Sequence, residues 1–226
     1  MEWLAGWLDV DFMTKFAPMY VKAAGVTVKI AFWGILFSML VGFVCSAVQY
    51  YKVPVFKTVT AVYIELSRNT PLLVQLFFLY FGLPKIGLKW SAEACAIIGL
   101  TFLGGSYMAE AFRSGLESVE KIQMESAISL GFSPWQTMKE IIFPQALAVS
   151  VPALCANVIF LIKETSVVSG IALADLMYVA KDLIGLYYQT DEALIMLVLA
   201  YLVLLLPVSI LASWLERRLR YAGFGH

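Results

Sequence analysis

The sequence predicts an all-α membrane protein, because the chain is too apolar and too poor in charge for a soluble domain. Of its 226 residues, 61% are hydrophobic and 14% are charged, and the mean hydropathy is +0.82. A soluble domain is about half apolar and about a quarter charged. One soluble core does not accommodate such an excess, so the bilayer is the expected solvent. The acidic N-terminus lacks the basic region of a cleavable signal.

Five segments approach the length of about 20 apolar residues that a helix needs to cross the hydrocarbon core. The second is broken at residues 68–71, and the fifth contains Pro207, which a spanning helix tolerates as a kink. We expect a single transmembrane domain over residues 1–226. Its spans are predicted at about 23–48, 53–83, 92–112, 146–171 and 193–214.

The distribution of lysine and arginine predicts the orientation in the membrane. Five spans place the termini on opposite sides, and the basic cluster at 217–220 favours a cytoplasmic C-terminus. We therefore expect the N-terminus outside. Segment 1–22 is then an amphipathic stretch on the outer surface. The aromatic residues suited to the interface there are Trp3, Trp7, Phe12 and Phe16.

Several function classes lack the residues they need. His226 is the only histidine, which argues against histidine-based catalysis and histidine metal sites. Cys45, Cys95 and Cys155 lie in apolar runs and are interpreted as small buried hydrophobes. The net charge is zero, so nothing indicates nucleic acid. The sequence has no Gly-rich phosphate loop, Walker-type lysine motif or nucleophile elbow. Energy for uphill transport would come from another chain or an ion gradient.

The longest polar stretch, residues 113–140, lies between the third and fourth spans and is expected in the cytoplasm. Periodicity predicts a short amphipathic helix over 119–130, ended by Gly131. Ser133 is suited to cap a second helix that begins at Pro134. A surface loop that packs on its own spans is the alternative interpretation. The apolar face of the second helix would consist of Trp135, Met138, Ile141 and Ile142.

This stretch resembles the EAA loop of ABC importer permeases, in which Glu-Ala-Ala precedes Gly, Ile and Leu-Pro at fixed spacing. Here Glu-Ser-Ala at 125–127 precedes Gly131, Ile141 and Pro144 at that spacing, and Phe143 replaces the leucine. The resemblance implies a coupling loop at about 115–144 that docks on an ATPase subunit. The coupling residues it implies are Glu125, Ser126, Ala127, Leu130 and Gly131.

Other motifs resemble the polar amino acid permeases of the histidine/glutamine/arginine type. These motifs lie at 25–28, 68–75, 107–115 and 163–167, and the resemblance covers nearly the whole chain. It implies a type I importer fold, multi-pass, in the inner membrane of a bacterium. It also implies an ATPase dimer that binds ATP and Mg, so that this chain needs no cofactor. The other implied partners are a second permease, identical or related, and an extracytoplasmic amino acid-binding protein.

Polar residues at bilayer depth are candidates for the substrate path. Helical spacing puts Asn157 and Glu164 on one face of the fourth span. Glu164 is suited to accept the ammonium group of an amino acid. Thr70 and the backbone amides freed at Pro71 are suited to bind its carboxylate. Ser166 is also expected to line the path.

The alternative is that Lys163 and Glu164 pair with Glu110 or Lys29 and only stabilise the bundle. Lys181 and Asp182 are expected in a solvated outer loop. We expect structural or gating roles for Arg68, Glu110, Arg113 and Lys163.

The substrate is the least constrained prediction. Permeases for cationic amino acids in this branch tend to carry an acidic residue at the position of Asn157. The amide favours glutamine, glutamate, aspartate or cystine, whereas Glu164 favours the alternative of arginine, lysine or histidine. Two other function classes are a self-sufficient secondary transporter or channel and an intramembrane enzyme. The first would leave the EAA-like loop unexplained, and the second lacks a nucleophile–base pair, so we expect a transport subunit and not an enzyme.

Overall fold

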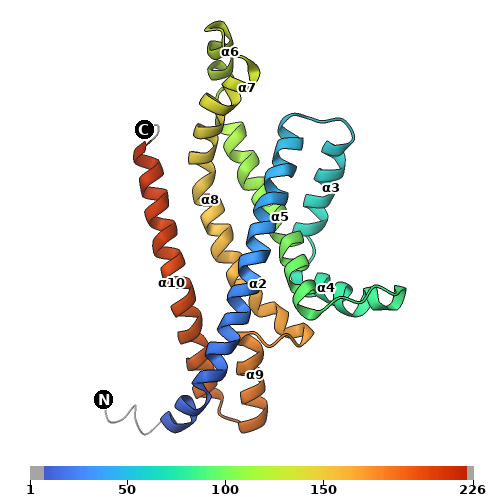
Figure 1. Ribbon diagram of the computed structural model, residues 1–226, viewed down its shortest axis with the longest axis vertical. Helices are drawn as coiled ribbons and strands as arrows, with labels where there is room; N and C mark the ends of the chain where they lie inside the picture. The colour runs from blue at the N-terminus through green and yellow to red at the C-terminus, as the bar shows by residue number, and fades with distance from the viewer. Residues whose placement is uncertain (1–7, 223–226) are drawn as a thin grey trace. The chain divides into compact units, whose positions relative to one another are not determined.

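The computed structural model describes residues 8–222, and that range consists of helices joined by short turns (Figure 1). It contains no strand between residues 8 and 222, so the predicted all-α class is confirmed. Trp3 and Trp7 lie outside the described residues. The α-helices are α2 (Val10–Tyr50), α3 (Phe56–Arg68), α4 (Leu72–Phe77), α5 (Ala92–Ser118), α6 (Lys121–Ser129), α7 (Pro134–Thr137), α8 (Phe143–Glu164), α9 (Leu176–Tyr187) and α10 (Thr190–Ala222).

Four shorter segments of different helical pitch extend or join these helices. Two are π-helical, with one residue more per hydrogen-bonded turn than an α-helix, and two are 3-10 helical. The π-helical segments are η1 (Phe78–Gly82) and η3 (Met138–Ile142), and the 3-10 segments are η2 (Leu83–Ile86) and η4 (Thr165–Ile171).

Four helical stretches between residues 10 and 219 are long and apolar enough to cross a membrane: Val10–Tyr50, Ala92–Ser118, Pro134–Ile171 and Thr190–Leu219. The predicted span 53–83 is interrupted between α3 and α4, at the break that the sequence predicted. Its first part, α3, has 13 residues and is therefore only about 20 Å long. The break follows from Pro71, which lacks a backbone N–H and disfavours helical geometry in the residue before it.

The first span is longer at its N-terminal end than the prediction of 23–48. Helix α2 begins at Val10, where the side chain of Asp9 accepts the backbone N–H of Phe12 at 2.9 Å. Phe12 and Phe16 are 9% and 8% exposed, so their predicted place at the membrane interface is wrong. They pack instead against Tyr187, the last residue of α9. The sequence did not predict α9, and the packing of Phe12 and Phe16 against this helix explains why α2 begins as early as Val10.

The chain divides into two compact units that alternate along the sequence. Unit 1 comprises Met1–Gly34, Pro71–Leu100 and Phe160–Val208. Unit 2 comprises Ile35–Thr70, Thr101–Ile159 and Ser209–His226. Each unit therefore contains parts of α2, α5, α8 and α10, and neither unit is a continuous stretch of chain. The prediction of one domain over the whole chain stays a prediction.

The core of unit 1 is formed where α9 packs against the first part of α2 and the start of α10 (Figure 1). The side chains that α9 buries have the spacing of a helical stripe: Leu176, Val179, Ala180 and Leu183. The Tyr20 hydroxyl in α2 donates to the carbonyl oxygen of Ala193 at 2.8 Å. Lys181 and Asp182, predicted in a loop, lie on this helix with exposed side chains.

Unit 2 is built on close contacts of α5 with α3 and α8. The hydroxyls of Tyr63 and Ser67 in α3 both donate to the carbonyl oxygen of Phe102, at 2.7 and 2.8 Å. Gly115 lies where α5 approaches α8 most closely. A Cβ atom there would lie 2.0 Å from Ser150 Oγ and 2.3 Å from the carbonyl oxygen of Ala146. Only glycine permits this approach.

Candidate functional site

Helix α6 ends in a hydrogen-bonded turn centred on Gly131. The backbone N–H of Gly131 donates to Ile128 at 2.9 Å, and that of Phe132 donates to Ala127 at 3.1 Å. This pair of bonds is the Schellman motif, which requires a left-handed residue after the helix. Gly131 has a φ of 86° and fulfils this requirement. The predicted helix end at Gly131 is therefore confirmed.

Helix α7 begins directly after this turn, at the predicted residue. The Ser133 hydroxyl accepts the backbone N–H of Gln136 at 3.3 Å, and the Gln136 side chain accepts the N–H of Ser133 at 2.9 Å. This capping box, with Pro134 in the first turn, fixes the direction of α7. The π-helical segment η3 then continues into α8. Hydrogen bonds within the chain, at the C-terminal end of α6 and at the N-terminal end of α7, thus fix the conformation of this loop.

Helix α6 buries almost nothing against its own chain. Of its nine residues only Ala127 is buried, and the predicted coupling residues Glu125 and Ser126 are exposed. Leu130, at its C-terminal end, is 79% exposed. Trp135 is 72% exposed, whereas Ile142 is 2% exposed, so Trp135 does not join the predicted apolar face of α7 in burial. Other apolar side chains exposed on this loop are Ile122, Met124, Ile128 and Phe132.

A chain of ion pairs joins α3 to α5 in unit 2. Glu110 lies 2.9 Å from Arg113 and 3.6 Å from Arg68, measured between carboxylate oxygen and guanidinium nitrogen. Arg113 also contacts Glu117 at 3.0 Å. These side chains are between 31% and 55% exposed, so solvent screens each pair and its individual contribution is small. The structure thus places the three predicted gating residues Arg68, Glu110 and Arg113 in one network.

Asn157 is next to this network through Tyr107. Its side-chain amide donates to the backbone carbonyl of Tyr107 at 3.1 Å. The guanidinium of Arg68 lies 5.3 Å from the centre of the Tyr107 ring, within the range of a cation–π contact. Asn157 is half-buried and keeps its amide oxygen as an acceptor.

The other predicted substrate-lining residues fall in both units. Thr70 belongs to unit 2, and its hydroxyl donates to the carbonyl oxygen of Leu66 at 2.8 Å. Glu164 and Ser166 belong to unit 1 and are both half-buried. The Glu164 carboxylate makes no hydrogen bond or salt bridge with the described residues, and Lys163 beside it is exposed.

The alternative pairing of Lys163 and Glu164 with Lys29 or Glu110 does not occur. Lys29 forms a salt bridge with Glu93, and Glu110 pairs with Arg68 and Arg113. Within residues 8–222 no group of three histidine, cysteine or acidic side chains is placed to hold a metal ion.

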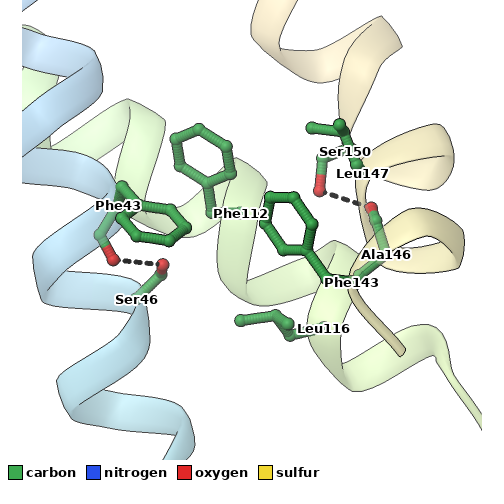
Figure 2. A pocket seen from close by; sticks show the side chains of 8 residues that line it. All are labelled: Phe43, Ser46, Phe112, Leu116, Phe143, Ala146, Leu147 and Ser150. Atoms are coloured by element: carbon green, nitrogen blue, oxygen red, sulfur yellow. Dashed lines mark hydrogen bonds between the residues drawn. The ribbon is translucent and has the colours of Figure 1, made fainter. Parts of the chain in front are cut away.

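An open pocket in unit 2 is apolar and does not suit an amino acid. Figure 2 shows the rings of Phe43, Phe112 and Phe143 gathered from three helices, with centroids 5.7 Å (Phe43–Phe112) and 6.2 Å (Phe43–Phe143) apart. The hydroxyls of Ser46 and Ser150 donate to carbonyl oxygens of their own helices at 2.8 Å. The pocket presents no free polar group. Phe143, which departs from the leucine of the EAA pattern, contributes one of its walls.

Sequence reasoning missed α9 and the contact between Arg68 and Tyr107. The signal for α9 was present, because Asp175 is a favourable N-cap and four apolar residues follow at helical spacing. No sequence signal pairs Arg68 with Tyr107, since they lie on different helices.

Comparison with known proteins identifies relatives along nearly the full chain. Residues 34–221 match the family model described as "Binding-protein-dependent transport system inner membrane component". The chain is 33% identical over 217 residues to the probable amino-acid ABC transporter permease protein PatM of Vibrio harveyi, covering 95% of this chain and 97% of that protein. It is 41% identical over 160 residues to the probable glutamine ABC transporter permease protein GlnP of Bacillus subtilis, covering 71% and 73%. It is 30% identical over 216 residues to the arginine transport system permease protein ArtQ of Bacillus subtilis, covering 94% and 99%.

Two solved structures share the fold. A chain from the crystal structure of an amino acid ABC transporter with histidines superposes with a TM-score of 0.86 at 33% identity, covering 93% of this chain and 99% of that one. A chain of the inward-facing MetNI methionine ABC transporter gives a TM-score of 0.73 at 16% identity, covering 91% and 98%. At that identity the second comparison supports the fold alone.

Proposed function

Because the chain belongs to the amino-acid ABC transporter permeases, the inner-membrane components of binding-protein-dependent transport systems, we propose that it carries a polar L-amino acid into the cell. The favoured substrates are glutamine, glutamate, aspartate and cystine. The observation that carries this choice is Asn157, a half-buried amide held by Tyr107 where a cationic substrate would favour a carboxylate. The GlnP relative, named for glutamine, is consistent with it.

The alternative substrate class is a cationic amino acid such as arginine, lysine or histidine. It is supported by Glu164, a half-buried carboxylate that no described cation neutralises by a salt bridge, and by the relative named for arginine. We assign Glu164 to the ammonium group that all amino acids share, so its charge does not select the side chain. We assign the backbone amides freed at Pro71, beside Thr70, to the substrate carboxylate, and Ser166 to the lining of the path.

Uptake measurements with Asn157 and Glu164 variants test these assignments. Asn157→Ala and Glu164→Gln should each raise the KM for uptake, because each removes a group that binds the substrate. Asn157→Asp should shift the preference toward arginine. The matched control is Asp191→Asn, which neutralises an exposed carboxylate in the first turn of α10 and should leave uptake unchanged. Wild-type kinetics in both variants would refute the lining role.

We assign the surface of α6 to the ATPase subunit. The support is its exposure: apolar side chains lie uncovered on a loop expected in the cytoplasm, and large apolar patches on water-exposed surfaces usually bind a partner. A short helix that presents Leu130 beside small residues such as Ser126 suits insertion into a groove. ATP and Mg²⁺ are assigned to the ATPase dimer and not to this chain. The remaining proposed partners are a second permease and an extracytoplasmic binding protein.

We assign Arg68, Glu110 and Arg113 to gating, because a network of exposed ion pairs between α3 and α5 is able to rearrange at small cost. Lys163, which is exposed and has no salt bridge among the described residues, is assigned a structural role.

Replacing the turn glycine tests the coupling role. Gly131→Ala strains a residue at φ 86° and should reduce both copurification of the ATPase and substrate-stimulated ATP hydrolysis. Gly87→Ala is the matched control, because Gly87 has φ 89° and open space around its Cα. Glu125→Ala should also weaken coupling. Undiminished copurification and coupling in both Gly131→Ala and Glu125→Ala would refute the assignment.

A further inference from the structure

The turn between α2 and α3, residues 51–55, lies where the first span ends. Residues 30–50 of α2 carry no charge and rise about 31 Å along the helix, close to the thickness of the hydrocarbon core, about 30 Å. The turn follows directly, so we place it at the level of the lipid headgroups. Figure 1 shows it at the same end of unit 2 as α6 and α7, which is the end expected in the cytoplasm.

Two backbone conformations in this turn are unfavourable for the residues that adopt them. Lys52 has a φ of 53°, and Val55 has a φ of 67° with a ψ of −56°. The Phe56 N–H donates to the Pro54 carbonyl oxygen at 2.7 Å across Val55, which makes this a γ-turn of the rare, strained form. A branched side chain is poorly suited to positive φ. Strain of this kind persists only where the surroundings hold the backbone, and it is concentrated at functional sites.

The side chains of this turn are not held in the core of the chain. Tyr51, Val55 and Phe56 are 60%, 75% and 62% exposed. The ring of Tyr51 contacts that of its neighbour Tyr50, with centroids 5.3 Å apart. These residues form an apolar tip at the end of a membrane span, a position in which aromatic side chains are enriched because it lies between the headgroups and the acyl chains. A contact from the bilayer is therefore available to hold the turn.

The turn also carries positive charge that no salt bridge balances within the described residues. Lys52 and Lys57 are both exposed and both lack such a bridge. Residues 30–64 contain no aspartate or glutamate. Lys29, before the uncharged stretch of α2, differs, because its Nζ lies 2.5 Å from a carboxylate oxygen of Glu93. An anionic phosphate is the complement that the two lysines of the turn lack, and anionic leaflets attract basic residues at the ends of spans.

We propose that the α2–α3 turn is a binding site for an anionic phospholipid of the cytoplasmic leaflet. Lys52 and Lys57 bind the phosphate, while Tyr51, Val55 and Phe56 lie against the glycerol and the first carbons of the acyl chains. The lipid thereby holds the strained turn and fixes the start of α3, the helix that shares an ion pair with α5. The site goes beyond the transport function and does not depend on which amino acid is carried.

Hydrogen exchange on the intact transporter complex in lipid nanodiscs tests the site. The backbone amides of residues 51–58, Pro54 excepted, are compared in phosphatidylcholine and in an equal mixture of phosphatidylcholine and phosphatidylglycerol. Wild-type exchange should be about fivefold slower in the mixture, because each lysine gains from an anionic surface. The amides of residues 188–190, in a turn without lysine or arginine, report the general effect of a charged bilayer, and their change is subtracted.

Charge variants show whether the two lysines carry the effect. Lys52→Gln with Lys57→Gln should abolish the slowing, whereas Lys52→Arg with Lys57→Arg keeps the charge and should retain it. Lys85→Gln with Lys89→Gln is the matched control, because it removes two exposed lysines elsewhere and should leave the slowing unchanged. Soluble glycerol phosphate, added to phosphatidylcholine nanodiscs, should not slow exchange, because the apolar tip requires acyl chains.

Equal exchange of residues 51–58 in the two bilayers overturns the lipid site and leaves the turn to a protein partner. A double glutamine variant that keeps the slowing also overturns it, and slowing by glycerol phosphate alone overturns the lipid as the ligand. If a variant does not assemble, salt decides with the wild type. The slowing should shrink at about 0.5 M salt, which screens exposed charges, and slowing that is independent of salt contradicts the proposal.

Discussion

Helices α6 and α9 are both short and both carry apolar side chains, but α9 buries them and α6 leaves them exposed. Helix α9 buries Leu176, Val179, Ala180 and Leu183 in the core of unit 1. Helix α6 buries only Ala127, and Leu130 at its end is among the most exposed apolar residues described. The apolar side chains of α9 are therefore covered by other parts of the same chain. Helix α6 keeps an apolar surface that its own chain leaves uncovered.

This difference teaches that a helical stripe of apolar residues predicts a contact but not the molecule that makes it. The stripe on α9 contributes to stability, because its burial removes apolar surface from water within the chain. The apolar surface of α6 contributes nothing to folding while it stays exposed. The loop that contains α6 is stabilised instead by local hydrogen bonds at Gly131 and Ser133. The following substitutions separate these two roles.

The largest effect is expected in α9. Leu183→Ala should lower the free energy of unfolding by about 3 kcal/mol, because it leaves a cavity at a residue that is 1% exposed. Reversible unfolding in detergent measures the loss. Leu186→Ala, three residues on and 64% exposed, is the matched control and should change stability by less than about 0.5 kcal/mol. Equal losses in the two variants would contradict the assignment of a buried and an exposed face.

A smaller effect, of a different kind, is expected at the end of α6. Leu130→Ala should weaken binding of the ATPase subunit about tenfold, as loss of an apolar anchor does. Its unfolding free energy should stay within about 0.5 kcal/mol of wild type, because Leu130 is 79% exposed. Titration of the purified subunits together with unfolding curves gives both quantities. A large loss of stability with unchanged binding would contradict the assignment of Leu130 to the ATPase subunit, and would make α6 resemble α9.

Removing the cap of α7 is expected to have an effect of about 1 kcal/mol. Ser133→Ala loses the hydroxyl that accepts the Gln136 N–H and should lower the stability of the loop by that amount. Ser133→Asp keeps an acceptor and should restore it. Hydrogen exchange of the amides in α7 is the measurement. Unchanged exchange in Ser133→Ala would show that tertiary contacts, and not the cap, hold this helix.

The smallest effect is expected at Ser126. Ser126→Ala introduces the better helix former at an exposed position and should stabilise α6 by about 0.4 kcal/mol. It also creates the Glu-Ala-Ala of the EAA pattern, so coupling should be unchanged. Helix content of the loop by hydrogen exchange and coupled ATP hydrolysis are the two measurements. A loss of coupling would assign the Ser126 hydroxyl a contact of its own.

Local chemistry made the cytoplasmic loop predictable from sequence. Gly131, Ser133 and Pro134 each have a conformational preference that acts within a few residues, and the structure places each where that preference indicates. The spans were predictable in class from hydropathy, but the start of α2 was not. Its extension to Val10 depends on packing between Phe12 and Tyr187, which lie far apart in the sequence.

The polar residues were predictable as candidates but not as partners. The i,i+3 spacing of Glu110 and Arg113 indicates their pair, but nothing in the sequence indicated that Arg68, on another helix, would also contact the Glu110 carboxylate. Asn157 and Glu164 share a helix, as their spacing requires, but they belong to different units. Side-chain pairing between helices depends on how the helices pack, which periodicity alone does not specify.

The π-helical segment η3 helps to set the direction in which the loop of α6 and α7 projects from α8. It inserts one residue into the helical repeat, and each residue of an α-helix advances by about 100°. Deleting one residue from the regular helix of α8, where no such turn absorbs the change, would rotate everything before it by that angle. The same α6 surface, with every side chain intact, would then face another direction. The spacing along the chain is therefore as much a determinant of where this surface faces as the residues that form it.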